Sequence, residues 1–226
     1  MTRIKLCGLS RLEDIEAANR LKPDYVGFVF WPESRRAVTP AQAARLKAAL
    51  DPSIRAVGVF VNEDPETVAQ LLEAGVIDLA QLHGRENPAY LRLLAGFTSR
   101  PFIQAFRVKG QAALDRALES TADHLLLDAG AGEGKAFDWS LLKNIDRPYF
   151  LAGGLNPGNA ADAVRTLRPF SVDVSTGIES DVKKDEEKMT AFIRVSGMYC
   201  PPWTPNRPLG LVMVSVPFCP PGGPPR

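Results

Sequence analysis

The stretch from Arg3 to Phe30, RIKLCGLSRLEDIEAANRLKPDYVGFVF, contains one strand, one helix and a second strand. Its first five residues, Arg3 to Cys7, alternate in polarity, which is typical of a strand with two different faces. Apolar residues then recur at the spacing of one helix face, at Leu12, Ile15, Ala18 and Leu21. A second apolar run begins at Asp24. This order favours parallel pairing of the two strands, because the helix returns the chain to the starting edge.

The same unit repeats along the chain. Apolar or β-branched runs begin 21 to 31 residues apart, near Arg3, Asp24, Arg55, Asp78, Phe102, Asp123, Tyr149 and Ser171. Helix-like stretches separate them, among them 11–21, 41–50, 66–74, 89–95, 158–167 and 184–193. Eight strands alternating with eight helices predict an α/β protein, a single (β/α)8 TIM barrel. An open doubly wound sheet is the alternative, but no G-x-G-x-x-G follows the first strand.

Composition divides the chain into two parts. Residues 1–195 are expected to form the barrel, the catalytic domain. Residues 196–226 hold nine of the 19 prolines and no acidic residue. Proline at this density blocks helices and strand ladders alike, so a disordered or surface-draped, irregular tail is expected there.

Charge and cysteine content exclude several classes of protein. The 226 residues carry 27 basic and 26 acidic side chains, which argues against nucleic acid as a partner. A membrane span is not expected, because no apolar run reaches about 18 residues. The N-terminus lacks an apolar signal-like core, and three cysteines do not suggest a disulfide framework, so a cytoplasmic location is expected. We expect a monomer rather than a homodimer.

In a barrel of this kind, chemistry belongs at the C-terminal ends of the strands. Cys7 ends the first strand, and Lys5 lies in phase with it, so the lysine charge favours a thiolate. A small buried filler is the structural alternative for this cysteine. Asp128 ends the sixth strand directly after three leucines, where a carboxylate must be solvated, paired or used as a cap. The glycine-rich loop 129–135 after it is expected to be mobile and able to fold over a ligand.

The loops after the last two strands predict a phosphate site. Gly153 and Gly154 follow the seventh strand, and Thr176 and Gly177 follow the eighth. Glycine lets main-chain N–H groups approach an anion, and these two loops commonly bind phosphate in such barrels. Ordinary turn chemistry explains either loop alone, but finding both at the expected places favours a phosphate ligand.

Other polar residues near strand ends are candidates for substrate binding. Arg35 and Arg36 suit a carboxylate, although one of the two is expected to be a solvated surface charge. Gln81 and His83 are in phase at the end of the fourth strand, whereas His124 begins its strand and is expected to be structural. Only two histidines exist and no metal-ligand spacing occurs, so no metal site is expected.

Together these motifs resemble the phosphoribosylanthranilate isomerase family of tryptophan biosynthesis. The matching pieces occur in order over most of residues 3–194: Lys5-Leu6-Cys7-Gly8, Gly27-Phe28-Val29-Phe30 with Ser34-Arg35-Arg36, Val57-Gly58-Val59-Phe60-Val61-Asn62, Gln81-Leu82-His83-Gly84, Leu126-Leu127-Asp128, Gly134-Lys135 with Phe137-Asp138-Trp139, Ala152-Gly153-Gly154-Leu155-Asn156-Pro157, and Val172-Asp173-Val174-Ser175-Thr176-Gly177-Ile178-Glu179. The loop after Asp128 is shorter than is usual in the family, and the tail after about residue 195 has no counterpart in it.

The resemblance implies a cofactor-free Amadori rearrangement of N-(5-phosphoribosyl)anthranilate to 1-(2-carboxyphenylamino)-1-deoxyribulose 5-phosphate. It implies that Asp128 is the general acid and Cys7 the general base. It further implies that Arg36 holds the anthranilate carboxylate, that Gly153, Gly154, Thr176 and Gly177 bind the phosphate, and that Asp173 orients the acid or the substrate.

Two alternatives remain open at the level of sequence. One is another cofactor-free sugar-phosphate isomerase on the same barrel, such as the histidine-pathway relative, which uses a pair of aspartates; Cys7 disfavours it. The other is a non-catalytic barrel that binds a phosphorylated ligand.

Overall fold

The computed structural model of the chain describes residues 2–129, 139–142 and 145–197. The expectations for residues 130–135 of the loop after Asp128 and for residues 198–226 of the tail lie outside the described residues. Cys200 and Cys219 lie there too.

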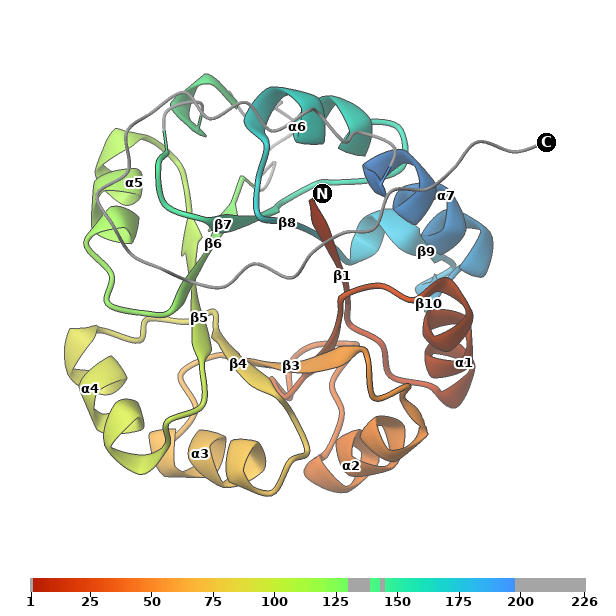
Figure 1. Cartoon of the computed structure of the whole chain (residues 1–226). Helices are drawn as coiled ribbons and strands as arrows, with labels where there is room; N and C mark the ends of the chain where they lie inside the picture. The colour runs from red at the N-terminus through yellow and green to blue at the C-terminus, as the bar shows by residue number, and fades with distance from the viewer. Residues whose placement is uncertain (1, 130–138, 143–144, 198–226) are drawn as a thin grey trace, which may run out of the picture.

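Eight parallel strands form a closed barrel in sequence order, which confirms the predicted fold. Figure 1 looks along the barrel, with the strands inside an outer ring of helices. The strands are β1 (Arg3–Cys7), β2 (Tyr25–Val29), β3 (Arg55–Phe60), β4 (Leu79–Leu82), β5 (Phe102–Arg107), β6 (His124–Asp128), β7 (Tyr149–Ala152) and β8 (Ser171–Val174). The ring closes where β8 pairs with β1, placing Lys5 opposite Asp173.

The helices follow the strands as expected, with one difference. They are α1 (Leu12–Leu21), α2 (Pro40–Ala49), α3 (Pro65–Glu73), α4 (Pro88–Phe97), α5 (Gln111–Leu118), α6 (Ala160–Leu167) and α7 (Glu186–Gly197). Between β6 and β7 an α-helix was expected, but the described residues there form a short 3-10 helix, η2 (Trp139–Leu142). After β8 come a second 3-10 turn, η3 (Thr176–Ile178), and a hairpin of β9 (Glu179–Ser180) and β10 (Lys183–Lys184).

Local signals in the sequence set several helix starts. Asp64 and Asn87 accept hydrogen bonds from the free N–H groups at the beginnings of α3 and α4. In each case the next residue is proline, whose fixed φ suits the first helical position. These caps fix where the loops after β3 and β4 end, at the C-terminal end of the barrel strands.

The alternation along β1 separates two environments. Ile4 and Leu6 belong to the large apolar core between strands and helices, whereas Lys5 and Cys7 lie on the other strand face. Inside the barrel, a second apolar cluster is built from Tyr25, Val57, Leu79, Ile103, Leu126, Phe150 and Ala152. His124 stacks on Phe170 with ring centroids 5.6 Å apart, at the start of β6, in agreement with a structural role. The polar end of the barrel interior is therefore the opposite one, where the strands end.

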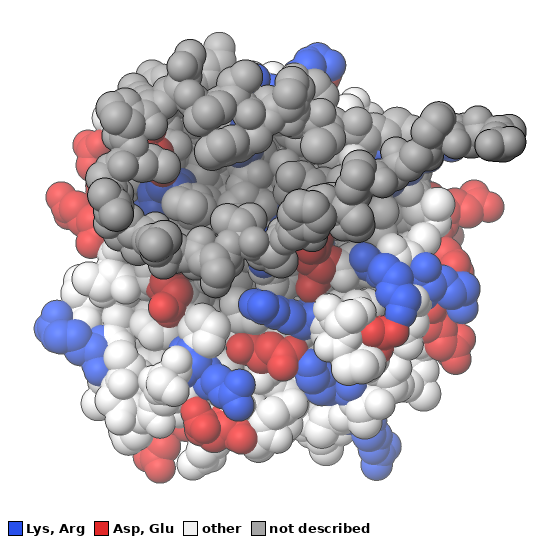
Figure 2. All heavy atoms as spheres, in the orientation of Figure 1, with Lys and Arg blue, Asp and Glu red and all other residues white. Residues whose placement is uncertain are grey.

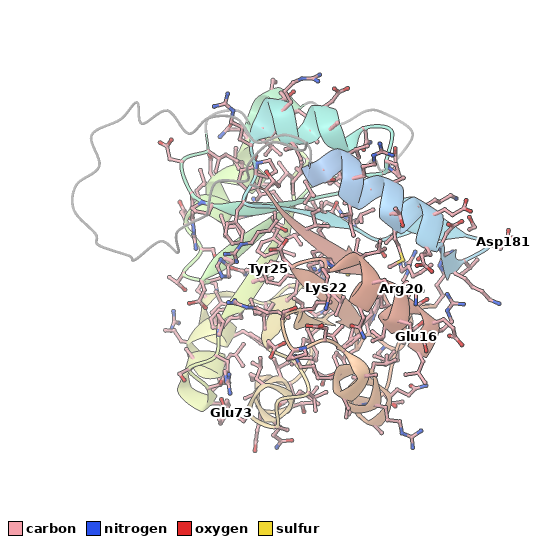
Figure 3. All side chains as sticks on the ribbon, turned by 45° about the vertical axis from the view of Figure 1, so that its right-hand side comes forward. Glu16, Arg20, Lys22, Tyr25, Glu73 and Asp181 are labelled. Atoms are coloured by element: carbon pink, nitrogen blue, oxygen red, sulfur yellow. The ribbon has the colours of Figure 1, made fainter. Side chains whose placement is uncertain are left out.

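Ion pairs tie the last helix to the first. Arg20 of α1 donates from Nε and Nη2 to Glu186 at the start of α7, at 2.9 and 2.7 Å, and Figure 3 shows Arg20 at this junction. On the surface visible in Figure 2, basic and acidic side chains are interspersed. None of the helices in the described ranges has the length and apolar character needed to cross a membrane.

Candidate active site

A pocket of about 570 Å³ opens at the C-terminal ends of the barrel strands. The ten residues singled out from the sequence all line it: Cys7, Arg36, Gln81, His83, Asp128, Gly153, Gly154, Asp173, Thr176 and Gly177. Trp31, Ser34 and Arg107 also line it, and sequence reasoning did not single them out as site residues. These residues come from most strands of the ring, so closure of the barrel is what brings them together.

Cys7 lies at the end of β1 beside a buried ion pair. The Lys5 ammonium is fully buried and donates to Asp173 Oδ1 at 2.8 Å. Burial raises the pKa of the Cys7 thiol, and this effect outweighs the opposing charge of Lys5. The lysine thus acts in the direction expected from the sequence, but the net shift is toward the protonated thiol.

Lys5 keeps its charge in spite of burial. Burial alone lowers the pKa of an amine, but the Asp173 carboxylate and the neighbouring Cys7 raise the pKa of Lys5 above its ordinary value. A cation therefore lies next to the thiol, where it stabilises a thiolate when the proton leaves.

Asp128, at the end of β6, lies close to His83, which directly follows β4. His83 in turn contacts Gln81 of β4. His83 Nε2 lies 3.6 Å from Asp128 Oδ2, and His83 Nδ1 lies 3.3 Å from Gln81 Nε2. An amide that donates to Nδ1 leaves the imidazole proton on Nε2, facing the carboxylate. Gln81 is almost completely buried, and its Oε1 has no hydrogen-bond partner among the residues described.

Arg36 projects from the loop after β2 into the pocket. Its Nε and Nη2 donate to the two Glu179 oxygens at 2.5 and 2.8 Å, and Nη2 also donates to Thr176 Oγ1 at 3.1 Å. The side chain of Arg35 is half exposed and donates to the same carboxylate at 2.8 Å. The sequence reasoning expected one arginine of the two to be a surface charge, and Arg35 has that exposure.

Glu179 and Lys184 are polar residues that the sequence reasoning did not assign to the site. Lys184 Nζ donates to Glu179 Oε1 at 2.8 Å, and both side chains are at most 4% exposed. Burial raises the pKa of Glu179, but hydrogen bonds from Arg36 and Lys184 outweigh burial and bring this pKa to about 2. One signal in the sequence could have found them: Glu179 and Lys184 carry opposite charges and follow closely after the predicted phosphate-binding loop.

The two glycine-rich loops meet at the rim of the pocket. Gly153 and Gly154 have φ of 95° and 68°, in the region that favours glycine. A Cβ on Gly177 would collide with the backbone oxygen of Leu155, so the loops after β7 and β8 are in direct contact. Small residues here leave main-chain groups accessible to an anion.

Metal ligands are not grouped in the part of the chain that the structure describes. Residues 2–129, 139–142 and 145–197 contain no set of three or more His, Cys, Asp or Glu side chains arranged to hold a metal ion.

The fold and the pocket together define a (β/α)8-barrel protein of the enzyme type, with its polar groups at the end of the barrel where such proteins carry their chemistry. Comparison with known proteins specifies the family. The model of the family described as N-(5'-phosphoribosyl)anthranilate (PRA) isomerase matches residues 4–195.

Individual relatives agree with this match. The chain is 41% identical over 200 residues to N-(5'-phosphoribosyl)anthranilate isomerase of Endomicrobium trichonymphae, covering 86% of this chain and 98% of the relative. It is 43% identical over 207 residues to the protein of that name from Acetivibrio thermocellus, covering 85% and 94%. The crystal structure of phosphoribosyl anthranilate isomerase from Thermotoga maritima is 38% identical, with a TM-score of 0.81 over 87% of this chain and 99% of that one. The chain belongs to the N-(5'-phosphoribosyl)anthranilate isomerase family.

Proposed function

We propose that the chain catalyses the Amadori rearrangement of N-(5'-phosphoribosyl)anthranilate to 1-(2-carboxyphenylamino)-1-deoxyribulose 5-phosphate, a step of tryptophan biosynthesis. The observation that carries this proposal is that a thiol and a carboxyl group, Cys7 and Asp128, line one pocket together with groups suited to two anions. A related structure of the same isomerase, 37% identical with a TM-score of 0.78 over 87% of this chain and 99% of that one, holds the reduced product analogue.

Asp128 acts first, as the general acid. It gives a proton to the ribose ring oxygen, the bond from this oxygen to C1 breaks, and the nitrogen lone pair forms an iminium. His83, 3.6 Å away, turns its Nε2 toward Asp128 and orients the carboxyl group. Gln81 supports this orientation through Nδ1 of His83.

Cys7 then acts as the general base. Its thiolate removes the proton from C2, and the electron pair of the C–H bond moves into the iminium, which yields an enolamine. The enol hydroxyl loses its proton, C1 gains one, and the ketone results, so the reaction is a pure isomerisation without a cofactor. The raised pKa of Cys7 makes the thiolate a stronger base once formed, and the adjacent Lys5 ammonium stabilises it.

The phosphate end and the anthranilate end of the substrate are bound by different groups of the pocket. The phosphate binds to main-chain groups of the loops that contain Gly153, Gly154, Thr176 and Gly177. Arg36 holds the anthranilate carboxylate through a charge-assisted hydrogen bond. Asp173 fixes Lys5 and so shapes the surroundings of the base.

The decisive test is turnover by the purified chain. Freshly made phosphoribosylanthranilate is fluorescent and the product is not, so the proposal expects a rapid loss of fluorescence that depends on enzyme concentration. No loss of fluorescence, with binding of the substrate retained, would instead support a barrel that only binds phosphorylated ligands. Turnover of a histidine-pathway aminoaldose phosphate in its place would support the other isomerase.

We further propose a monomeric, cytoplasmic protein. A relative from Thermotoga maritima is described as a dimeric isomerase of which monomers were generated, so light scattering across a range of protein concentrations is the appropriate measurement. A concentration-independent mass of twice the 24.6 kDa chain would overturn this proposal.

A further inference from the structure

Glu179 is the centre of a charge cluster beside the pocket. Within the described ranges three cationic side chains donate to its two oxygens: Arg36, Arg35 and Lys184. The Glu179 carboxylate is only 4% exposed, so its position is set by these partners rather than by solvent. Three positive charges and one negative charge leave the cluster with an excess of positive charge, which attracts an anion.

The hairpin of β9 and β10 fixes Glu179 in place. Its register puts Lys184 directly opposite Glu179, so the ion pair is a cross-strand pair. The turn residues Asp181 and Val182 both have positive φ, 47° and 70°, and Figure 3 shows Asp181 at the outer edge of the molecule. A β-branched residue in this region is strained and persists only where the surrounding structure holds it.

Contacts on both sides anchor this hairpin to the barrel. Arg11, at the start of α1, donates to the Lys184 carbonyl oxygen at 3.2 Å, and Lys188 Nζ donates to the Glu179 carbonyl oxygen at 2.7 Å. Lys184 Nζ is in turn surrounded by acceptors, the Ser175 carbonyl oxygen at 3.0 Å and the Glu179 carboxylate at 2.8 Å. This environment suits a protonated amine, although burial lowers the pKa of Lys184.

The held carboxylate in turn sets the direction of Arg36. Glu179 occupies Nε and one side of Nη2, and Thr176 takes the remaining contact of Nη2. Nη1 makes no hydrogen bond to any residue that the structure describes, and Arg36 lines the pocket. Gly8, with φ of 79°, leaves room for the arginine, because a Cβ there would collide with Arg36 Cδ.

We propose that Glu179, held by Lys184, is the positioning residue that orients Arg36 toward the aryl carboxylate of the substrate and thereby sets the preference for a 2-carboxyaryl amine. The inference rests on the proposed function. It assigns to Glu179 no contact with the substrate: the carboxylate fixes a guanidinium that would otherwise sample several rotamers.

The test measures separately how the pocket binds the anthranilate end and the phosphate end of the substrate. In Glu179→Gln the amide retains the size of the side chain but loses its charge, and one of its two terminal atoms becomes a donor facing the arginine. We expect KM for phosphoribosylanthranilate to rise about tenfold or more while kcat changes less than about threefold, as loss of ground-state binding predicts. Binding of anthranilate, measured by calorimetry, should weaken in parallel, whereas binding of inorganic phosphate should stay unchanged.

A matched control and a second variant keep the test decisive. Glu186→Gln removes a different ion-paired glutamate, which pairs with Arg20 and is not among the lining residues of the pocket, and should change none of these values. If Glu179→Gln does not fold, Glu179→Asp keeps the charge but draws it back by one methylene, and should produce the same selective loss of anthranilate binding.

Two outcomes would overturn the inference. One is unchanged KM and unchanged anthranilate binding in a folded variant; the other is an equal loss of anthranilate and phosphate binding, which means general damage to the pocket. Should the unaltered chain bind both fragments but fail to turn over phosphoribosylanthranilate, the proposed function fails, and the fragment measurements still decide the role of Glu179.

Discussion

The protonation of Cys7 depends on the fully buried ammonium group of Lys5 beside it. Lys5 pairs with Asp173 at 2.8 Å, and the Lys5 charge opposes the effect of burial on the pKa of Cys7. Lys184 acts in the same direction, and Asp173 in the opposite one. The protonation state of the base therefore reflects a balance between burial and three nearby charges.

Replacing Lys5 should shift this balance measurably. In the double variant Lys5→Met/Asp173→Asn the cation and its partner are removed together, so no unpaired buried charge remains. Lys5 lowers the pKa of Cys7 more than Asp173 raises it, so with both gone we expect this pKa to rise further and the alkylation of Cys7 by iodoacetamide to slow several-fold at a fixed pH near 8. The pH profile of alkylation, compared with that of the unaltered chain, measures the shift; an unchanged profile would contradict the role given to Lys5.

The single variant Lys5→Met provides a control on stability. It leaves Asp173 buried without its cation, which should lower the free energy of unfolding by about 3–5 kcal/mol. The double variant should recover part of this loss in denaturant unfolding.

Sequence reasoning reached Cys7 and Asp128 but not Glu179 for a physical reason. Strand phase and strand ends are readable locally, and both groups lie at a strand end. Glu179 acquires its role through the pairing with Lys184 across a turn of Asp181 and Val182, which lacks the Asn-Gly or Asp-Gly signal of a tight hairpin. Only the folded hairpin brings the two charges together.

At the scale of elements, the hairpin of β9 and β10 carries a pH-dependent contribution to stability. The pKa of Glu179 falls from an ordinary 4.5 to about 2 in the folded chain, since its arginine and lysine partners outweigh burial. A lowered pKa means that the stabilisation is present above pH 4.5 and is lost as pH falls toward 2.

Glu179→Gln should therefore flatten the acid limb of the stability curve. Between pH 5 and 3 the unaltered chain should lose more free energy of unfolding than the variant, as measured by urea unfolding at several pH values. Only part of the shift from 4.5 to about 2 falls between pH 5 and 3, so the difference should be modest, about 1–2 kcal/mol. Parallel curves for the two proteins would show that Glu179 is not stabilised by its partners.

The strands were readable from the sequence, whereas the described part of one connection differs from the helix predicted for it. Each strand begins within one residue of its predicted start, because short apolar runs bounded by turns and caps are a local signal. Between β6 and β7 the repeat predicts an α-helix, yet Trp139–Leu142 form a 3-10 helix. The regular spacing of the strand starts predicts the number of strand–helix units. The type of helix in each unit depends on side-chain contacts, which the spacing does not specify.

At the scale of the whole molecule, closure of the ring joins residues that are far apart in the chain. The Lys5–Asp173 pair links positions 168 residues apart, and α7 packs outside the barrel against β1, α1 and α6. The sequence predicted a closed barrel from eight similar units. It did not predict that Lys5 pairs with Asp173, because that pairing depends on the register between β1 and β8.

The last helix should mark the end of the cooperative unit. α7 runs to Gly197, two residues beyond the expected boundary of the barrel, and buries Met189, Phe192 and Ser196. A chain ending at Gly197 should thus unfold in one transition with a midpoint close to that of the full chain, as followed by circular dichroism.

A cut before α7, after Asp185, is the contrasting variant. It removes Met189 and Phe192 from the core, each of which contributes about 2–5 kcal/mol, so this chain should lose cooperative unfolding. Equal loss of cooperativity in the chain ending at Gly197 would show that residues 198–226 are part of the folded unit.

Turnover of phosphoribosylanthranilate by three purified proteins, the unaltered chain, Cys7→Ala and Asp128→Asn, tests the central claim most directly. We expect the unaltered chain to abolish the substrate fluorescence, and each variant to lose about 100-fold or more of this rate while its unfolding midpoint stays close to native. Near-normal turnover in either folded variant would contradict the assignment of a thiol base and a carboxyl acid at this pocket.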